Sequence, residues 1–209
     1  MDHKIIVFGA SGNTGIKICE ELNSLNIKHT AFVRKGSESK IKTPLTEVVQ
    51  GDVLNKTDIQ NAFKTESHTD IIVALGSRDL KVLNIRSNGT RNIIEVLKSN
   101  AISSKIHIIS AHGVRESWDS LRWYEKLLSN LFLGKTMKDH DLQEKAVITN
   151  PGGYHIVRPV ALKNTPGTGK IHSQTEGSLP SGEISRADVA KYLVASLLEG
   201  KDGASSICK

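Results

Sequence analysis

Three glycines near the start of the chain, Gly9, Gly12 and Gly15, recur at every third position directly after the apolar run 4–8. Glycine adopts a positive φ without steric cost, and a backbone without side chains can bring its N–H groups close to a phosphate. A helix that starts here would direct its positive end at the same anion. We predict a pyrophosphate-binding loop, with a glycine-rich turn of an unrelated α/β domain as the alternative. The predicted loop residues are Gly9, Ser11, Gly12, Asn13, Thr14 and Gly15.

Arg34, which ends the second predicted strand, indicates which dinucleotide would bind. It lies about 20 residues after the glycines, where an Asp or Glu binds the ribose of NAD and an Arg accommodates the 2′-phosphate of NADP. The first carboxylate after this strand is that of Glu38. We therefore predict NADP(H), with Arg34 pairing with the phosphate or stacking on adenine. A surface arginine in a turn is the alternative.

Small and polar residues also follow the next two predicted strands, 46–49 and 70–75. Asp52 could accept a hydrogen bond from the adenine amino group, or it could cap the helix predicted over 56–63. The backbone after the second of these strands would pass beside the phosphates and ribose of the cofactor. The cofactor-binding residues predicted here are Asp52, Val53, Leu75, Gly76 and Ser77.

Ser110 and His112 follow the predicted strand 105–109, and the carboxyl ends of parallel strands are where such sheets place their chemistry. We predict that Ser110 orients the nicotinamide carboxamide or the substrate. His112 would donate a hydrogen bond or a proton, because the pKa of histidine lies near neutrality. A purely structural His112 is the alternative.

Strands and helices alternate along the whole chain, as in a doubly wound sheet. We predict one Rossmann-like α/β domain over residues 1–209, with a parallel sheet and helices on both faces. The predicted strands are 4–8, 28–33, 46–49, 70–75, 105–109 and 154–158. The predicted helices are 14–25, 56–63, 84–100, 139–149 and 186–198, the last with Ser185 as its cap.

Two segments, 110–138 and 160–184, are predicted to form the substrate region. The first contains both tryptophans of the protein, Trp118 and Trp123, in a stretch with near-helical apolar spacing. It would form a substrate wall or lid, or else a helix packed on the core. The second is mostly a long loop rich in Gly, Pro, Ser and Thr, and loops of that length tend to be functional.

The overall composition excludes several classes of partner. The formal net charge is +6, but the basic residues are scattered and no aromatic residues interleave with them, so we expect no nucleic acid partner. Cys19 and Cys208 form neither a disulfide framework nor a metal-ligand pattern. No targeting segment or membrane span is apparent. We therefore expect a cytoplasmic monomer or weak homodimer with no metal and no membrane partner.

These motifs together resemble the atypical short-chain dehydrogenases, and most of all the branch of NADPH-dependent flavin reductase and biliverdin-IXβ reductase and the NmrA-like proteins. The resemblance implies that Pro159 contacts the cofactor. It also implies that His140, four residues before Glu144, bonds the nicotinamide ribose, with an exposed helix histidine as the alternative. The residues that carry the resemblance are the glycine triplet, Arg34, Gly51-Asp52, Ser110, Val157-Arg158-Pro159 and 184–190.

The chain departs from the general short-chain dehydrogenase pattern because it has no Tyr-x-x-x-Lys pair: Tyr124, Tyr154 and Tyr192 are followed four positions on by Leu, Arg and Ser. Carbonyl reduction usually relies on that pair as proton donor. We therefore expect hydride transfer from NADPH to a planar conjugated acceptor such as a flavin, biliverdin or a quinone, with a proton from water. The alternatives are a non-catalytic NADP(H) sensor and, more weakly supported, a nucleotide-sugar epimerase.

Overall fold

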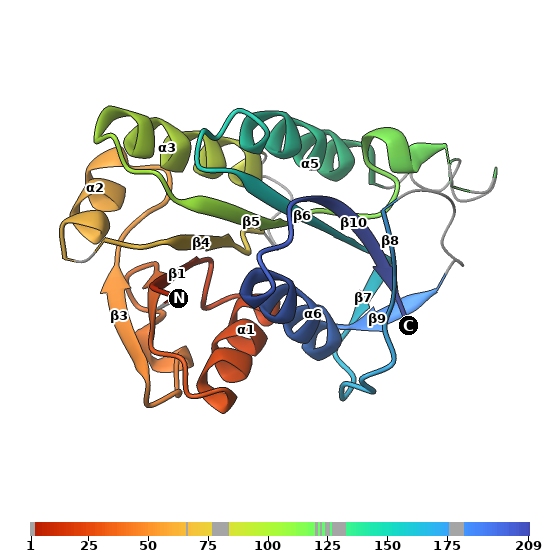
Figure 1. Cartoon of the computed structure of the whole chain (residues 1–209), viewed down its shortest axis with the longest axis horizontal. Coiled ribbons are helices and arrows are strands. Elements are labelled where there is room, and N and C mark those ends of the chain that lie inside the picture. Colours follow the sequence, from red (N-terminus) through yellow and green to blue (C-terminus); the bar gives the residue numbers. More distant parts are fainter. Residues whose placement is uncertain are drawn as a thin grey trace.

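The computed structural model describes residues 3–65, 67–76, 84–119, 121, 123, 126, 133–175 and 182–209. Within them, an eight-stranded sheet crosses the middle of the molecule in the order β3-β2-β1-β4-β5-β6-β10-β8 (Figure 1). All neighbouring strands run parallel except β8, which is antiparallel to β10. The strands are β1 (Ile5–Phe8), β2 (His29–Val33), β3 (Thr46–Gln50), β4 (Asp70–Val73), β5 (Lys105–Ile109), β6 (Tyr154–Pro159), β8 (His172–Gln174) and β10 (Gly203–Cys208). A separate pair joins β7 (Ala161–Lys163) to β9 (Glu183–Ser185).

Helices cover both faces of the sheet. On one face lie α1 (Asn13–Ser24) and α6 (Arg186–Leu198), and on the other lie α2 (Lys56–Thr65), α3 (Ile85–Ser99) and α5 (Gly134–Val147) (Figure 1). Two short 3-10 turns are η1 (Glu38–Lys40) and η2 (Arg115–Trp118). The central strands are apolar along their length because each face packs against helices. The predicted Rossmann-like, doubly wound α/β fold is confirmed.

Each face has its own apolar cluster, and neighbouring residues of one strand supply opposite clusters. Val7 packs on the side of α1 and α6, whereas Phe8 packs on the side of α2, α3 and α5. Phe8, Phe32 and Phe63 form the aromatic centre of the second cluster, with ring centroids 4.7 Å and 6.1 Å apart for the pairs that include Phe8. The core therefore fixes β1, the strand that leads into the glycine loop, on both of its sides.

The structure differs from the sequence-based expectation in three places. The last residues of the chain form β10, which we did not predict, and Cys208 is buried in that strand rather than placed in a tail. Helix α5 begins at Gly134, about one turn before the predicted start. The segment predicted as a long loop contains β8, and β7 and β9 pair at its two ends. No helix in the described part of the chain is both long and apolar enough to cross a membrane.

Candidate cofactor and active site

The carboxyl ends of the strands meet at one edge of the sheet. Phe8 at the end of β1 pairs with Phe32 of β2 and with Val73 of β4. The ladder continues past the strands, because the Ala74 N–H donates to the Phe8 carbonyl at 2.9 Å and the Ser110 N–H to the Val157 carbonyl at 2.8 Å. Ligands of open α/β sheets bind at this edge. The predicted residues that directly follow these strand ends therefore lie along one edge.

The glycine loop passes very close to the neighbouring backbone. Gly9 has a φ of +81°, and a Cβ there would lie 2.6 Å from the Ala74 carbonyl oxygen at the end of β4. A Cβ at Gly15 would overlap the Gly9 carbonyl, so this glycine allows α1 to start directly against the loop. We predicted that the glycines here let the backbone approach a phosphate. The structure shows that the chain itself already requires Gly9 and Gly15.

The first turn of α1 is suited to an anion. Its N-cap residue is Gly12, which has no side chain to accept a hydrogen bond, and no acidic residue lies in the first turn. Asn13 and Thr14 are half-buried there. The positive end of the helix dipole is therefore not neutralised by a capping carboxylate. These residues fit the pyrophosphate of a dinucleotide.

Arg34 lies exposed where β2 ends, and it forms no ion pair with any residue that the structure describes. The Ser37 N–H donates to the Arg34 carbonyl at 3.0 Å, and the Lys40 N–H donates to the Ser37 carbonyl at 3.2 Å. Two successive turns therefore fold the segment back toward α1. The one carboxylate in these turns, that of Glu38, accepts from the Gly36 N–H at 2.9 Å, and the backbone N–H groups of Glu38 and Gly36 lower its pKa.

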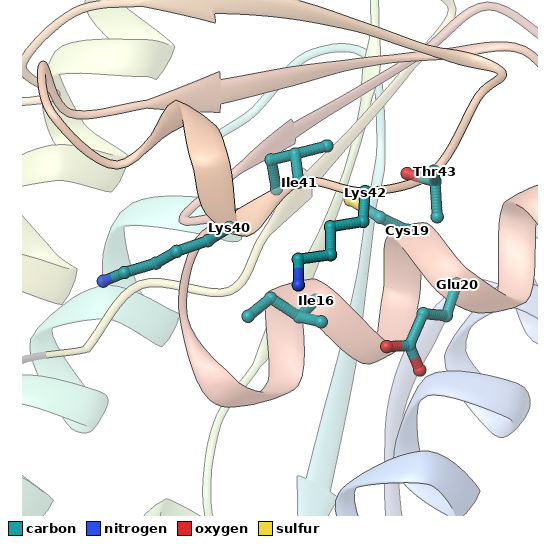
Figure 2. Close-up of a pocket in the computed structure, with 7 residues that line it drawn as sticks. All are labelled: Ile16, Cys19, Glu20, Lys40, Ile41, Lys42 and Thr43. Carbon is teal, nitrogen blue, oxygen red and sulfur yellow. The ribbon is translucent and has the colours of Figure 1, made fainter.

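A pocket of about 450 Å³ lies between α1 and this returning segment (Figure 2). Figure 2 shows Lys42 extending toward Ile16 of α1, while Lys40 extends away from it. Burial raises the pKa of the Cys19 thiol to about 12, so this cysteine is not a nucleophile at neutral pH. The pocket is lined by Ile16, Cys19, Glu20, Lys40, Ile41, Lys42 and Thr43. Together with Arg34, its two lysines place positive charge beside the end of β2.

Asp52 does not cap α2. Its carboxylate accepts from the Leu54 N–H at 2.9 Å, and its own N–H donates to Asp58 at 2.8 Å. The cap is Asn55, whose side-chain oxygen accepts from the Thr57 N–H at 3.0 Å. That part of the expectation is wrong because Asn55 lies directly before the helix. The exposed Asp52 carboxylate as an adenine contact stays a prediction, and Val53 is buried against α3 at Gly89.

Arg86 is a residue of this edge that sequence reasoning missed. A Cβ at Gly76 would lie 3.4 Å from its guanidinium, so Arg86 stands beside the end of β4. The Asp139 carboxylate of α5 fixes Arg86 in place. It accepts hydrogen bonds from the backbone N–H of Arg86 at 3.2 Å, from the Arg86 guanidinium at 3.4 Å and from the backbone N–H of Ser87 at 3.0 Å. The available signal for Arg86 was its place in the first turn of α3, the helix that follows β4. Ser77 lies outside the described residues.

Ser110 and His112 lie together beyond the end of β5. Ser110 is 3% exposed, and its hydroxyl has no hydrogen-bond partner in the described part of the chain. The His112 N–H donates to the Pro159 carbonyl at 2.9 Å and so joins this loop to the end of β6. A buried hydroxyl without a partner is costly, and a bound molecule that pairs with it would remove that cost.

A buried ion pair joins β6 to α5 beside this loop. Arg158 donates from its Nε to one oxygen of Glu144 at 2.9 Å and from a terminal nitrogen to the other at 2.7 Å. The same terminal nitrogen donates to Glu116 of η2 at 2.9 Å. Arg158 occupies the fourth position after Tyr154, where a Tyr-x-x-x-Lys pair would have its lysine. Its charge is used to hold three elements together.

His140 is buried on α5, so the alternative of an exposed helix histidine is wrong. Burial, and then the charge of Arg86, lower the pKa of His140 to about 3. The imidazole is therefore neutral at physiological pH. Its Nδ1 has no hydrogen-bond partner among the described residues, and contact with the nicotinamide ribose stays a prediction.

A family model described as NAD(P)H-binding matches residues 9–200. The chain belongs to this NAD(P)H-binding family. It is 29% identical over 203 residues to an uncharacterised chloroplastic protein of Arabidopsis thaliana, covering 94% of this chain and 72% of that one. It is 28% identical over 205 residues to the uncharacterised sugar epimerase YhfK of Bacillus subtilis, covering 94% and 88%.

Among solved structures, the NAD(P)H-binding protein is similar to the anaerobilin reductase ChuY of Escherichia coli O157:H7. The TM-score is 0.79 at 20% identity, with 98% of this chain and 96% of that chain covered. At 20% identity, this similarity shows only that the two chains share a fold. The expected resemblance to dinucleotide-binding reductases is confirmed at the level of the family. The cofactor is thereby shown as NAD(P)H, and the preference for NADP(H) remains to be argued from Arg34.

Proposed function

We propose that this NAD(P)H-binding protein is an NADPH-dependent reductase that delivers a hydride to a planar conjugated acceptor. The observation that carries the proposal is the Arg158–Glu144 ion pair, which lies at the carboxyl end of β6 with no tyrosine proton donor beside it in the part of the chain that the structure describes. Tyr154 begins β6 at the opposite edge, and Tyr192 lies in the middle of α6. Tyr124 lies outside the described residues.

Flavins and linear tetrapyrroles suit such a site because they accept a hydride without simultaneous proton donation to a carbonyl. NADPH, when bound, would supply the hydride from its nicotinamide ring. The chain would hold the acceptor in place, and positioning alone supplies much of the lowering of the barrier. The acceptor gains two electrons with the hydride, and one proton then follows from water or from His112. The anaerobilin reductase ChuY offers a precedent on the same fold.

Ser110 and His112 carry the proposed roles at the nicotinamide end. The Ser110 hydroxyl would orient the nicotinamide carboxamide or the acceptor, since it is a buried polar group at this edge without a hydrogen-bond partner among the described residues. His112 is fixed through its backbone to Pro159 and would donate from its ring. At the other end of the cofactor, the exposed Arg34 would pair with the 2′-phosphate and favour NADP(H) over NAD(H).

The test follows NADPH absorbance with purified protein and a panel of FMN, biliverdin isomers and quinones, each compared with a reaction without protein. We expect turnover with at least one acceptor and a higher kcat/KM with NADPH than with NADH. Binding of NADPH without turnover on the whole panel would contradict the reductase proposal and favour a sensor. Epimerisation of a nucleotide sugar without net NADPH oxidation would contradict it in favour of the activity named for YhfK.

A further inference from the structure

An open pocket of about 380 Å³ lies between η2 and the first turns of α5. It starts at Gly113, directly after His112, and therefore continues the edge at which the hydride would be transferred. The α5 side is formed by Met137, Lys138 and Asp141, whereas Gly113, Val114, Arg115 and Trp118 form the other side. A molecule held against Ser110 and His112 could extend into this pocket.

The lining of this pocket is positively charged. Lys138 is exposed and forms no ion pair with any residue that the structure describes. The Arg115 Nε is 3.6 Å from Glu116, but that carboxylate also accepts the shorter bond from the buried Arg158. The one lining carboxylate, that of Asp141, is already paired with Lys145 at 2.6 Å. Two cations thus line the pocket: Lys138 has no ion pair among the described residues, and Arg115 shares the Glu116 carboxylate with Arg158.

The same lining also contains an aromatic ring and a thioether. Trp118 and Met137 come from opposite sides of the pocket. The ring of Trp118 is half-buried, and the ammonium of Lys126 lies 5.9 Å from its centroid. Aromatic rings and thioethers pack well against planar molecules, and cations beside them bind anionic substituents. This combination fits a planar molecule that carries a negative group.

The backbone holds Arg115 in a fixed and costly conformation. Arg115 has a φ of +54°, which is unusual for a residue other than glycine. The Gly113 N–H donates to the Ser117 hydroxyl at 2.9 Å, and that hydroxyl donates to the Val114 carbonyl at 2.6 Å. Glu116, the next residue, is bonded to Arg158. The turn is therefore held by hydrogen bonds on both sides of Arg115, so its backbone position beside the pocket is fixed by the protein itself.

We infer that this pocket binds the anionic group of the acceptor, with Arg115 and Lys138 as specificity-determining residues and Trp118 against its planar part. The inference rests on the proposed function and narrows it to planar acceptors that carry a phosphate or a carboxylate. A neutral acceptor with the same ring system binds more weakly. The difference falls as ionic strength rises, because both cations are exposed to solvent.

The test compares acceptors that differ only in charge: FMN against riboflavin for a phosphate, and biliverdin against its dimethyl ester for carboxylates. In the wild type we expect KM to be about tenfold lower for the charged member of at least one pair. The double variant Arg115→Gln/Lys138→Gln brings that ratio close to one. The control variant Lys135→Gln removes an exposed cation of the same helix that does not line the pocket, and it keeps the ratio.

A binding measurement separates this inference from the proposed function. Trp123→Phe leaves Trp118 as the only tryptophan, and quenching of its fluorescence gives Kd values for the same pairs without any turnover. Absence of turnover with tighter binding of the charged member would overturn the reductase proposal and leave the pocket assignment standing. Equal Kd and KM values within both pairs, or a preference that survives in the double variant, would overturn the pocket assignment.

Discussion

In the proposed function, Arg34 determines the preference for NADP(H) over NAD(H). Replacing it by glutamine removes the one exposed guanidinium at the end of β2, and a charge-assisted pair is worth about 1.5–3 kcal/mol. We therefore expect Arg34→Gln to lower kcat/KM for NADPH roughly 10- to 100-fold and to leave kcat/KM for NADH nearly unchanged. Steady-state kinetics with both cofactors checks this. Arg91→Gln on the exposed side of α3 is the control, and an equal loss with both cofactors would contradict the assignment.

Ser110 gives a prediction in which stability and activity move in opposite directions. Its buried hydroxyl has no partner among the described residues, so Ser110→Ala removes a desolvation cost and leaves Tm unchanged or raised. The same change lowers kcat/KM about tenfold because a contact to the nicotinamide or acceptor is lost.

Ser196 provides the matched control for this experiment. Its hydroxyl is also buried and also without a partner in the described part of the chain, but it lies on α6, away from the reacting edge. Ser196→Ala should affect Tm similarly and preserve activity. If Ser110→Ala also preserves activity, Ser110 has no role in the reaction.

At the scale of elements, Arg158 and Glu144 join β6, α5 and η2. Glu144→Gln leaves the buried guanidinium without its full countercharge, and such losses cost about 3–5 kcal/mol. Urea unfolding should show this loss, whereas Glu20→Gln in the exposed Lys17–Glu20 pair should change stability by less than about 1 kcal/mol. The paired replacement Arg158→Met/Glu144→Leu should recover part of the loss. Equal stabilities of all four proteins would show that the ion pair does not hold these elements.

The elements that could be predicted from sequence are those whose signal is local. The run 105–109 contains three isoleucines and is flanked by Ser104 and Ser110, and β5 has the predicted bounds. Ser185 was predicted to cap α6, and its hydroxyl accepts from the Asp188 N–H at 2.9 Å. Strand β10 could not be found in this way because its serines show no strand period. It is defined by parallel pairing with β6, about 50 residues earlier in the chain, which no local pattern encodes.

In the candidate site, too, the residues with a local sequence signal could be predicted and those positioned by distant parts of the chain could not. The glycine loop and Arg34 were predictable because a strand, a turn and a helix follow each other directly in the chain. Arg86 was not, because Asp139 positions it from another helix. Most residues that line the pocket between η2 and α5 lie in the predicted substrate segment 110–138, but no local pattern indicates that they meet. The contacts of Asp188 were also not predictable from local sequence. It lies in the first turn of α6, and its carboxylate accepts hydrogen bonds of 2.8–3.0 Å from the backbone N–H groups of Thr168 and Gly169.

For the whole molecule, buried histidines predict instability in acid. Burial lowers the pKa of both His140 and His155 to about 3, with the charge of Arg86 acting on the first and those of His107, Lys105 and Lys201 on the second. Between pH 3 and 6.5 the unfolded chain therefore binds protons that the folded chain does not, and stability falls as pH drops below about 6.5.

Each of these two histidines should cost about 2 kcal/mol by pH 5. Urea unfolding at pH 8, 7, 6 and 5 measures the slope. His155→Gln should flatten it, and His172→Gln, at an exposed position, should not. A stability that stays constant from pH 8 to pH 5 would mean that these rings are not buried as neutral groups.

The central claim is that this NAD(P)H-binding protein moves a hydride from NADPH to a planar acceptor. Its most direct test is a single-turnover reaction with excess protein, in which NADPH deuterated at nicotinamide C4 is compared with ordinary NADPH in the presence of FMN or biliverdin. We predict oxidation well above the protein-free rate, a slower reaction with the deuterated cofactor, and transfer of the label to the reduced acceptor where its new C–H bond is stable. Oxidation no faster than in the protein-free control with every acceptor would contradict the account.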